Sequence, residues 1–281
     1  MLTELTKLPV GQLLGLSVLG ALVTTVGSLV ALVLKEYLFV RSFERWKSKQ
    51  TLTQIYKKYR DPILLAAEEL CHRIQETCQD YPPDYLQSKL ITVEPERMEH
   101  NSAIDRYYQV YKLKSSIYRL CAFLGWLELY RQEVVFMDSG RSTVNRHLNS
   151  CLAAIRSDLA DGQLNTAEDW MLWTDHLIFR EEQRAIGESM LVQTAGEKSV
   201  MGYGKFCEFL QEKSSQEQNR WFRQAVYFMT DLQDNGRDFR LVRLRRLVIH
   251  LIDLIELLEP AYISSGQHVQ RQEYKQLCGI A

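Results

Sequence analysis

One uncharged segment near the N-terminus constrains this chain more than any other feature. From Leu8 to Leu34 the sequence LPVGQLLGLSVLGALVTTVGSLVALVL contains no charged residue in 27 positions. As an α-helix it would be about 40 Å long, whereas the hydrocarbon core of a bilayer is about 30 Å thick. Soluble helices of this length carry charge on a solvent face, and the apolar part of a signal peptide is usually only about 7–15 residues. We therefore predict a transmembrane helix over residues 8–34.

The charges on either side of this segment predict its orientation. Glu4 and Lys7 precede it, whereas a cluster of basic residues follows it. This cluster comprises Lys35, Arg41, Arg45, Lys47 and Lys49. Because positive charge is retained on the cytoplasmic side, we expect residues 1–7 outside the cytoplasm and the residues after the transmembrane helix, 35–281, inside it. The cluster is also suited to face anionic lipid.

Small residues recur at four-residue spacing along the same segment. They are Gly11 and Gly15, followed by Gly20, Thr24 and Ser28. Such rows let two helices approach closely in a bilayer, which predicts a helix–helix packing face and a homodimer. Glycine is also common in membrane helices that do not pair, so both interpretations stay open.

The composition favours long helices for the remainder of the chain. Six prolines and 14 glycines in 281 residues are few, and no stretch alternates with a period of two, so we expect little sheet. A formal net charge of −1 gives no overall field to recruit nucleic acid. The six cysteines include no Cys-x-x-Cys pair, so we expect reduced thiols and neither disulfides nor a zinc site.

Hydrophobic periodicity divides this remainder into successive helices. We expect a basic linking helix over 35–60, a cytoplasmic helical bundle over 61–260 and a C-terminal tail over 261–281. Asp61 as N-cap and Pro62 at the first helical position predict where the bundle begins. Later helices are expected over 104–137, 142–159, 166–191, 200–212, 216–234 and 239–259. The predicted fold class is all-α, with an N-terminal transmembrane helix followed by a helical bundle.

Two groups of acidic residues and histidines have spacings that resemble metal or acid–base sites. Glu69 and His72 form a Glu-x-x-His pair, but a di-iron bundle needs two such pairs and the chain has one. A helical wheel also places this pair opposite the apolar face, toward water. His250, Asp253 and Glu256 are interpreted as the polar flank of an apolar helix. Phosphate-binding loops and serine-nucleophile motifs do not occur, so we expect no catalytic residue, metal or cofactor.

Four arginines begin the last helix: Arg240, Arg243, Arg245 and Arg246. No nucleic-acid-binding motif and no surplus of positive charge accompany them. We interpret them as a solvated helix face.

The stretch FREEQRAIGESM, residues 179–190, is unusually rich in charge between apolar neighbours. On a helical wheel most of its charged residues face solvent, but Glu182 and Gln183 flank or enter the apolar stripe. Polar groups there are costly without partners, so we expect a buried polar cluster. Its expected members are Glu182, Gln183, Arg73, Arg119 and Trp173.

Four motifs follow one another behind the N-terminal helix: YRDPILLAAEELCHRI, LGWLELYRQEVVFMD, FREEQRAIGESM and MGYGKF. In this order they resemble a bacterial family of uncharacterised single-pass membrane proteins. The resemblance extends from about Tyr59 to Pro260. It implies the same topology with a cytoplasmic all-helical domain, and it carries over no catalytic residue.

These observations favour a membrane-anchored helical domain that acts as a protein-interaction, scaffold or regulatory module. One alternative is an enzyme or small-ligand receptor with a buried polar pocket near Glu182. A second alternative is an anionic-lipid-sensing module that uses the basic residues after Leu34. A deep cavity around Glu182 would favour the receptor, and vesicle binding that depends on the basic residues would favour the lipid sensor.

Overall fold

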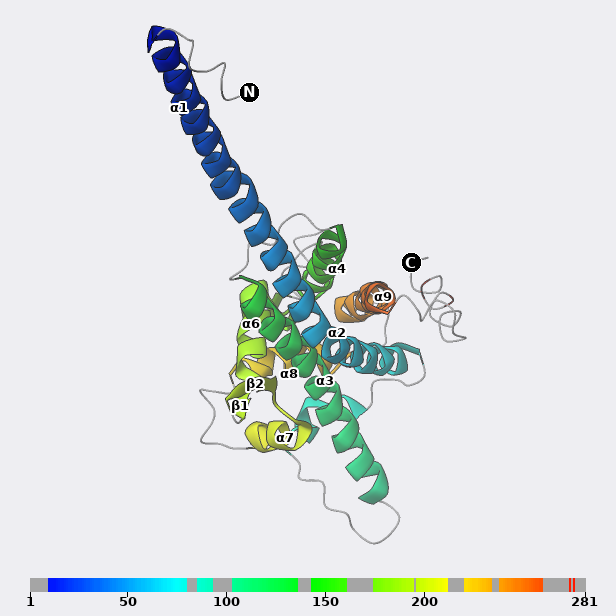
Figure 1. Cartoon of the computed structure of the whole chain (residues 1–281). Helices are drawn as coiled ribbons and strands as arrows, with labels where there is room; N and C mark the ends of the chain where they lie inside the picture. Colours follow the sequence, from blue (N-terminus) through cyan, green and yellow to red (C-terminus); the bar gives the residue numbers. More distant parts are fainter. Residues whose placement is uncertain are drawn as a thin grey trace. The chain divides into compact units, whose positions relative to one another are not determined.

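The computed structural model describes residues 10–79, 85–92, 103–135, 143–160, 174–194, 196–211, 220–233, 238–259, 273 and 275. The chain divides into two compact units, Met1–Gln54 and Ile55–Ala281. The described residues are helical apart from one short β-hairpin and the connecting segments, so the predicted all-α fold class is confirmed (Figure 1).

The first unit contains the apolar N-terminal helix. Helix α1 (Val10–Val33) passes into a π-helical segment, η2 (Leu34–Val40), and then into α2 (Arg41–Gln79). Every described side chain of α1 is exposed. The segment Ser17–Tyr37 is long and apolar enough to cross a membrane. The structure thus confirms a helix of transmembrane length at the predicted position.

Helix α2 does not begin at Asp61, so the predicted N-cap is wrong. The helix runs through this point with Pro62 inside it. Ile55, Tyr59 and Ile63 are buried at four-residue spacing across the proline. Their packing maintains the helix even though a proline removes one backbone hydrogen bond and disfavours a helix interior.

The second unit is a helical bundle formed by the C-terminal part of α2 and the elements that follow it. These elements are η4 (Ser88–Leu90), α3 (Ala103–Val135), α4 (Thr143–Leu159), η5 (Thr174–His176), α6 (Arg180–Ser189), α7 (Tyr203–Gln211), α8 (Phe222–Met229) and α9 (Phe239–Leu258). Helix α3 packs against α6, α7 and α8, and α4 packs against α9 (Figure 1). Leu120 and Phe123 in the middle of α3 are fully buried, so this part of the helix lies in the core.

A two-stranded antiparallel hairpin interrupts the helices where a helix end and a loop were expected. Strand β1 (Leu191–Thr194) pairs with β2 (Glu197–Val200), and Leu191 lies opposite Val200. Gly196 has a φ of 88° in the turn, a conformation that favours glycine. The expectation of little sheet is confirmed for the described residues, although the hairpin itself was not predicted.

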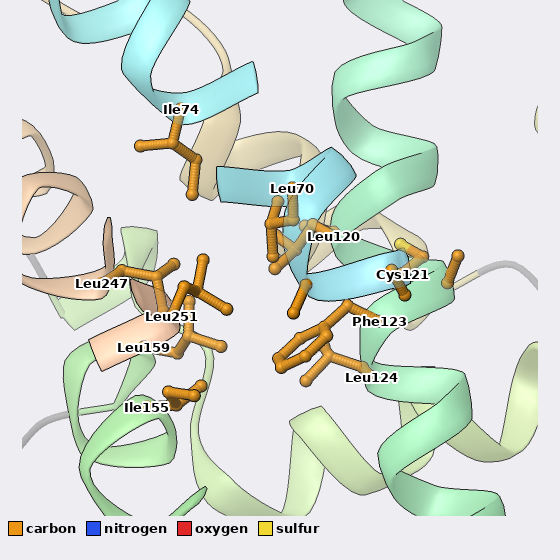
Figure 2. Packing of buried hydrophobic residues seen from close by; sticks show 14 of the residues in the cluster. Leu70, Ile74, Leu120, Cys121, Phe123, Leu124, Ile155, Leu159, Leu247 and Leu251 are labelled. Carbon is orange, nitrogen blue, oxygen red and sulfur yellow. The ribbon is translucent and has the colours of Figure 1, made fainter. Parts of the chain in front are cut away.

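The core lies where four helices meet (Figure 2). Figure 2 shows apolar side chains from α2, α3, α4 and α9 pointing toward one another: Leu70, Ile74, Leu120, Cys121, Phe123, Leu124, Ile155, Leu159, Leu247 and Leu251. Full burial of each large apolar side chain stabilises the fold by about 1.5–3 kcal/mol. Burial also raises the pKa of the Cys121 thiol well above its ordinary value, so this cysteine serves as a small apolar residue.

Two glycines allow α3 and α6 to approach closely. A Cβ atom on Gly187 would lie 2.7 Å from the Leu124 carbonyl oxygen and 2.7 Å from the Glu128 Cβ. A Cβ atom on Gly125 would lie 2.9 Å from the Met190 Cβ. Position 187 requires glycine because the obstructing atoms include the Leu124 backbone, whereas a Cβ at position 125 would crowd only the side chains of Met190 and Val200. The motifs LGWLELYRQEVVFMD and FREEQRAIGESM therefore pack against each other through this seam.

Candidate functional site

Glu182 has partners, but they differ from the predicted ones. One carboxylate oxygen accepts a hydrogen bond of 2.8 Å from the Phe179 backbone N–H, which lies just before α6. The other accepts one of 2.9 Å from Gln224 Nε2 on α8. The carboxylate therefore caps the N-terminus of α6, where negative charge is favoured, and ties α6 to α8.

Gln183 is buried, as the helical wheel indicated, and serves a different part of the fold. Its side-chain amide donates hydrogen bonds of 2.9 Å to the Arg156 carbonyl near the end of α4 and 2.8 Å to the Ile178 carbonyl. The Arg156 carbonyl also accepts from the Ala160 backbone N–H, so Gln183 provides a second donor at the end of α4. Gln183 is thus a structural link between α6 and α4.

Arg73 and Arg119 make their observed contacts elsewhere, so the predicted single cluster is wrong. Both belong to a group between α2 and α3 that we call the α2–α3 cationic cluster; it comprises Arg73, Lys112 and Arg119 together with Glu76 and Ser115. Trp173, the remaining predicted member, lies outside the described residues.

Helix periodicity and a shared carboxylate assemble the α2–α3 cationic cluster. Lys112 and Arg119 lie seven residues apart on α3, which places them on the same side of the helix. Arg73 on α2 donates a hydrogen bond of 3.1 Å to Ser115 Oγ. Glu76 contacts the Lys112 ammonium and lies 3.4 Å from Arg73 Nη1. Arg73 is 3% exposed and Lys112 7%, so these charges are largely shielded from water.

The electrostatics of this cluster reflect crowded positive charge. Burial, together with the neighbouring Arg73 and Arg119 guanidinium groups, lowers the pKa of Lys112 below its ordinary value. Burial and Arg73 likewise lower the pKa of Arg119, while Glu69 raises it. Lys112 also forms an ion pair with the Glu76 carboxylate. Each cation therefore destabilises its neighbours, and negative charge at this position would relieve them.

Arg243 is not part of a solvated face, so that interpretation is wrong for it. This arginine is 1% exposed and points into the end of α4. Its Nη1 donates hydrogen bonds to the carbonyls of Ser157 at 2.8 Å, Asp158 at 3.1 Å and Ala160 at 2.5 Å. With Gln183, it satisfies a buried helix C-terminus and places positive charge at the negative end of the helix dipole.

Arg240 plays the same role for α8, and the interpretation of a solvated face is wrong here also. It is 3% exposed and forms a two-pronged ion pair with Asp238, with hydrogen bonds of 3.0 and 2.8 Å. It also donates to the carbonyls of Tyr227 and Thr230, both at 2.7 Å, and Asp231 at 2.9 Å. Asp231 has a φ of 52°, so Arg240 holds the left-handed residue that ends the turn after α8.

Arg245 and Arg246 are half-buried on the same helix and do not form a fully solvated face either. Arg240 and Arg243 are buried and Arg245 and Arg246 are half-buried, so the positive charge of α9 lies at both buried and partly exposed positions. The tertiary position of the helix ends, which is not encoded locally in the sequence, decides which arginines are buried.

The spaced residues His250, Asp253 and Glu256 all have ionic partners. His250 Nδ1 lies 2.5 Å from an Asp158 carboxylate oxygen on α4. Asp253 and Glu256 both accept from the Lys275 ammonium, at 2.5 and 3.1 Å. These contacts join α9 to its neighbours. They are consistent with the predicted polar flank of α9. The flank also forms ion pairs with Asp158 on α4 and with Lys275.

Glu69 and His72 are both exposed on α2, as predicted. Within the part of the chain that the structure describes, no group of three or more histidine, cysteine, aspartate or glutamate side chains is arranged to hold a metal ion.

An open groove of about 660 Å³ lies beside the hairpin. Its lining includes residues of both strands and of α7: Leu191, Val192, Val200, Met201, Lys205 and Phe209. Within the described residues each strand pairs with the other alone. Sequence reasoning missed this groove because the hairpin itself was not predicted, although the Thr-Ala-Gly-Glu turn after β-compatible residues is a usable signal.

The predicted membrane-proximal residues are placed as follows. Lys35 in η2 and Lys47 in α2 have exposed side chains. The side chains of Arg41, Arg45 and Lys49 lie outside the described part of the structure. Among the predicted packing residues, Cβ atoms on Gly11, Gly15 and Gly20 would meet no atom within 4 Å, and Thr24 and Ser28 bond to carbonyls of their own helix.

The fold and these contacts define an all-α protein with an exposed apolar N-terminal helix and a helical bundle. Buried arginines in this bundle donate hydrogen bonds to the carbonyls of helix ends. No protein-family model, no curated protein and no solved structure matches the chain.

Proposed function

We propose that this protein is a single-pass protein of the cytoplasmic membrane whose helical bundle lies in the cytoplasm and acts by binding another protein. The observation that carries the proposal is the exposed, charge-free helix α1, followed by the basic start of α2. An exposed apolar helix of this length is stable in lipid and unfavourable in water. The basic residues after it favour a cytoplasmic bundle.

The use of polar residues in the bundle supports binding rather than chemistry. Glu182 and Gln183 bridge helices, and Arg240 and Arg243 cap helix ends. Most hydrogen-bonding atoms of these groups are used in structural hydrogen bonds, although the buried Gln183 Oε1 accepts none from the described residues. They are therefore poorly placed to line the substrate pocket that an enzyme or receptor near Glu182 would need, and the groove beside the hairpin does not include them.

The groove beside the hairpin is the proposed protein-binding surface. It combines a lining of apolar and polar side chains with a nearby strand edge, which an extended segment of a partner can join by backbone hydrogen bonds. Apolar side chains of the partner would enter the groove at alternate positions.

Site-specific photocrosslinking in the native membrane tests this surface. A photoreactive residue at half-buried Val192 in the groove is expected to capture a discrete partner protein. The matched control is the same residue at Val242, an apolar position on α9 that is 37% exposed. Equal capture at both positions, or none at Val192, would contradict the proposal.

A lipid-sensing role is the second candidate function. Phe43 and Trp46 are exposed and stacked, with ring centroids 5.9 Å apart, close in sequence to Lys47. Aromatic side chains and cations together suit the headgroup region of a bilayer. Neutralising the basic residues would reduce the preference of the reconstituted protein for anionic vesicles if this role is correct, and leave it unchanged if it is not.

A further inference from the structure

We propose that the α2–α3 cationic cluster is a binding site for a phosphate group, carried by a small ligand or by a lipid headgroup. The inference goes beyond protein binding and does not depend on the orientation of the chain in a membrane. It rests on three properties of the cluster: surplus positive charge, guanidinium N–H groups of a buried arginine that make no hydrogen bond, and hydroxyl groups that hold this arginine in place.

The charge of the cluster is incompletely neutralised. Three cations, Arg73, Lys112 and Arg119, lie close together: burial, Arg73 and Arg119 lower the pKa of Lys112, and burial and Arg73 lower the pKa of Arg119. Among the described residues, Glu76 and the exposed Glu69 are the carboxylates that act on them. The cluster therefore stays positive with both carboxylates ionised. Buried charge of one sign is unfavourable unless it is compensated, and a phosphate would supply that compensation.

The guanidinium group of Arg73 has N–H donors that make no hydrogen bond within the described residues. Arg73 is 3% exposed, yet its Nε makes no hydrogen bond to any described residue, and its Nη1 makes none beyond the 3.4 Å ion pair with Glu76. Buried guanidinium N–H groups normally have acceptors, and a phosphate offers several with matching geometry. The bond from Nη2 to Ser115 Oγ fixes the guanidinium in place. An arginine held in this way is preorganised for an anion.

Hydroxyl groups complete the surroundings of Arg73. Ser115 lies on α3, and Tyr85 bonds to Thr77 at an oxygen–oxygen distance of 3.1 Å. Burial raises the pKa of Tyr85, and the nearby Arg73 opposes that rise. The Ser115 hydroxyl donates to the Lys112 carbonyl and the Thr77 hydroxyl to the Arg73 carbonyl, so these hydroxyls hold Arg73 and its surroundings in place.

The cluster also reaches the surface. The Lys112 ammonium lies 5.1 Å from the centre of the Tyr108 ring, and Tyr108 is 49% exposed. Arg119 is half-buried on the same helix. A ligand can therefore approach along α3, while Arg73 holds its phosphate from the buried side.

The test is thermal unfolding of the full chain in a mild detergent at constant ionic strength. One arm replaces chloride with inorganic phosphate, and a second adds short-chain phosphatidic acid, with phosphatidylcholine as its control. Phosphate at about tenfold above its Kd is expected to raise Tm by about 3–5 °C. A shift with inorganic phosphate indicates a free ligand, and a shift with phosphatidic acid alone indicates a headgroup. No shift in either arm would overturn the proposal.

Two variants with opposite expected effects separate binding from simple stability. Glu76→Gln removes the competing carboxylate, so it should lower Tm without phosphate and enlarge the phosphate-dependent rise. Lys112→Gln should reduce that rise at least twofold. Arg223→Gln, which removes an exposed cation on α8, is the matched control and should leave the rise unchanged. A rise of the same size in Glu76→Gln and in the unmodified protein would show that phosphate acts elsewhere, even if Lys112→Gln does not fold.

Discussion

The Glu182 carboxylate joins three segments, since it accepts from Phe179 N–H and from Gln224 while lying on α6. We expect Glu182→Ala to destabilise the bundle by about 1–2 kcal/mol, because it removes a helix cap and leaves two donors without an acceptor. Glu181→Ala is the matched control, because Glu181 is exposed on the same turn and should change stability by less than about 0.5 kcal/mol. Thermal unfolding of both variants measures this difference, and equal shifts in Tm would contradict it.

His250 should make stability depend on pH. Its hydrogen bond to Asp158 raises its pKa, with help from Asp253, while burial and Arg246 act in the opposite direction. Because the folded pKa is above the unfolded value of about 6.5, the stabilisation is fully present below about pH 6.5 and is lost as pH rises through the folded pKa. We expect His250→Gln to lower Tm more at about pH 6 than at about pH 9. A Tm difference that is the same at both pH values would be inconsistent with this ion pair.

Single residues also show where sequence reasoning reaches its limit. The wheel indicated that Gln183 faces the interior, and the structure confirms this, but the wheel could not identify the α4 carbonyl that accepts its hydrogen bond. Arg240 and Arg243 were expected in solvent because a charge is normally costly to bury. The carbonyls of two other helix ends compensate them, and the positions of those ends are a tertiary property.

At the scale of elements, the contact of α3 with α6 depends on Gly187. We expect Gly187→Ala to destabilise the bundle by about 1–3 kcal/mol or more, because its Cβ would meet the Leu124 carbonyl at 2.7 Å. Gly204→Ala on α7 is the control: nothing lies within 4 Å of its Cβ position, and alanine should gain up to about 1 kcal/mol of helix propensity. Chemical denaturation measures both, and a Gly187→Ala variant as stable as Gly204→Ala would refute the close approach.

The elements were predicted most accurately where one apolar face is long and continuous. The helix expected over 239–259 is Phe239–Leu258, and the one expected over 142–159 is Thr143–Leu159. Short elements were predicted less well. The helix expected over 166–191 is described as η5 and the ten-residue α6, and the hairpin after it was missed, because four-residue strands show too few alternations to establish a period. Pro62 alone favours the start of a helix. The buried residues Ile55, Tyr59 and Ile63 on both sides of it stabilise a continuous helix instead.

At the scale of the whole molecule, the chain combines an exposed apolar helix with a bundle that has its own core. The apolar helix could be predicted from the sequence alone, because the absence of charge over such a length is decisive. The phosphate-binding proposal could not, since Arg73 and Lys112 are 39 positions apart in the sequence and meet only through the packing of α2 on α3. The two features are a helix long and apolar enough to cross a membrane and a bundle with its own buried core.

The orientation of the full chain in the membrane tests the central claim most directly. Two reporters fused after Ala281, one active only in the cytoplasm and one active only outside it, should give activity with the cytoplasmic reporter alone. Deletion of residues 8–34 should release the protein from the membrane fraction. Activity of the outer reporter alone, or a membrane association that survives the deletion, would contradict a cytoplasmic domain anchored by its N-terminal helix.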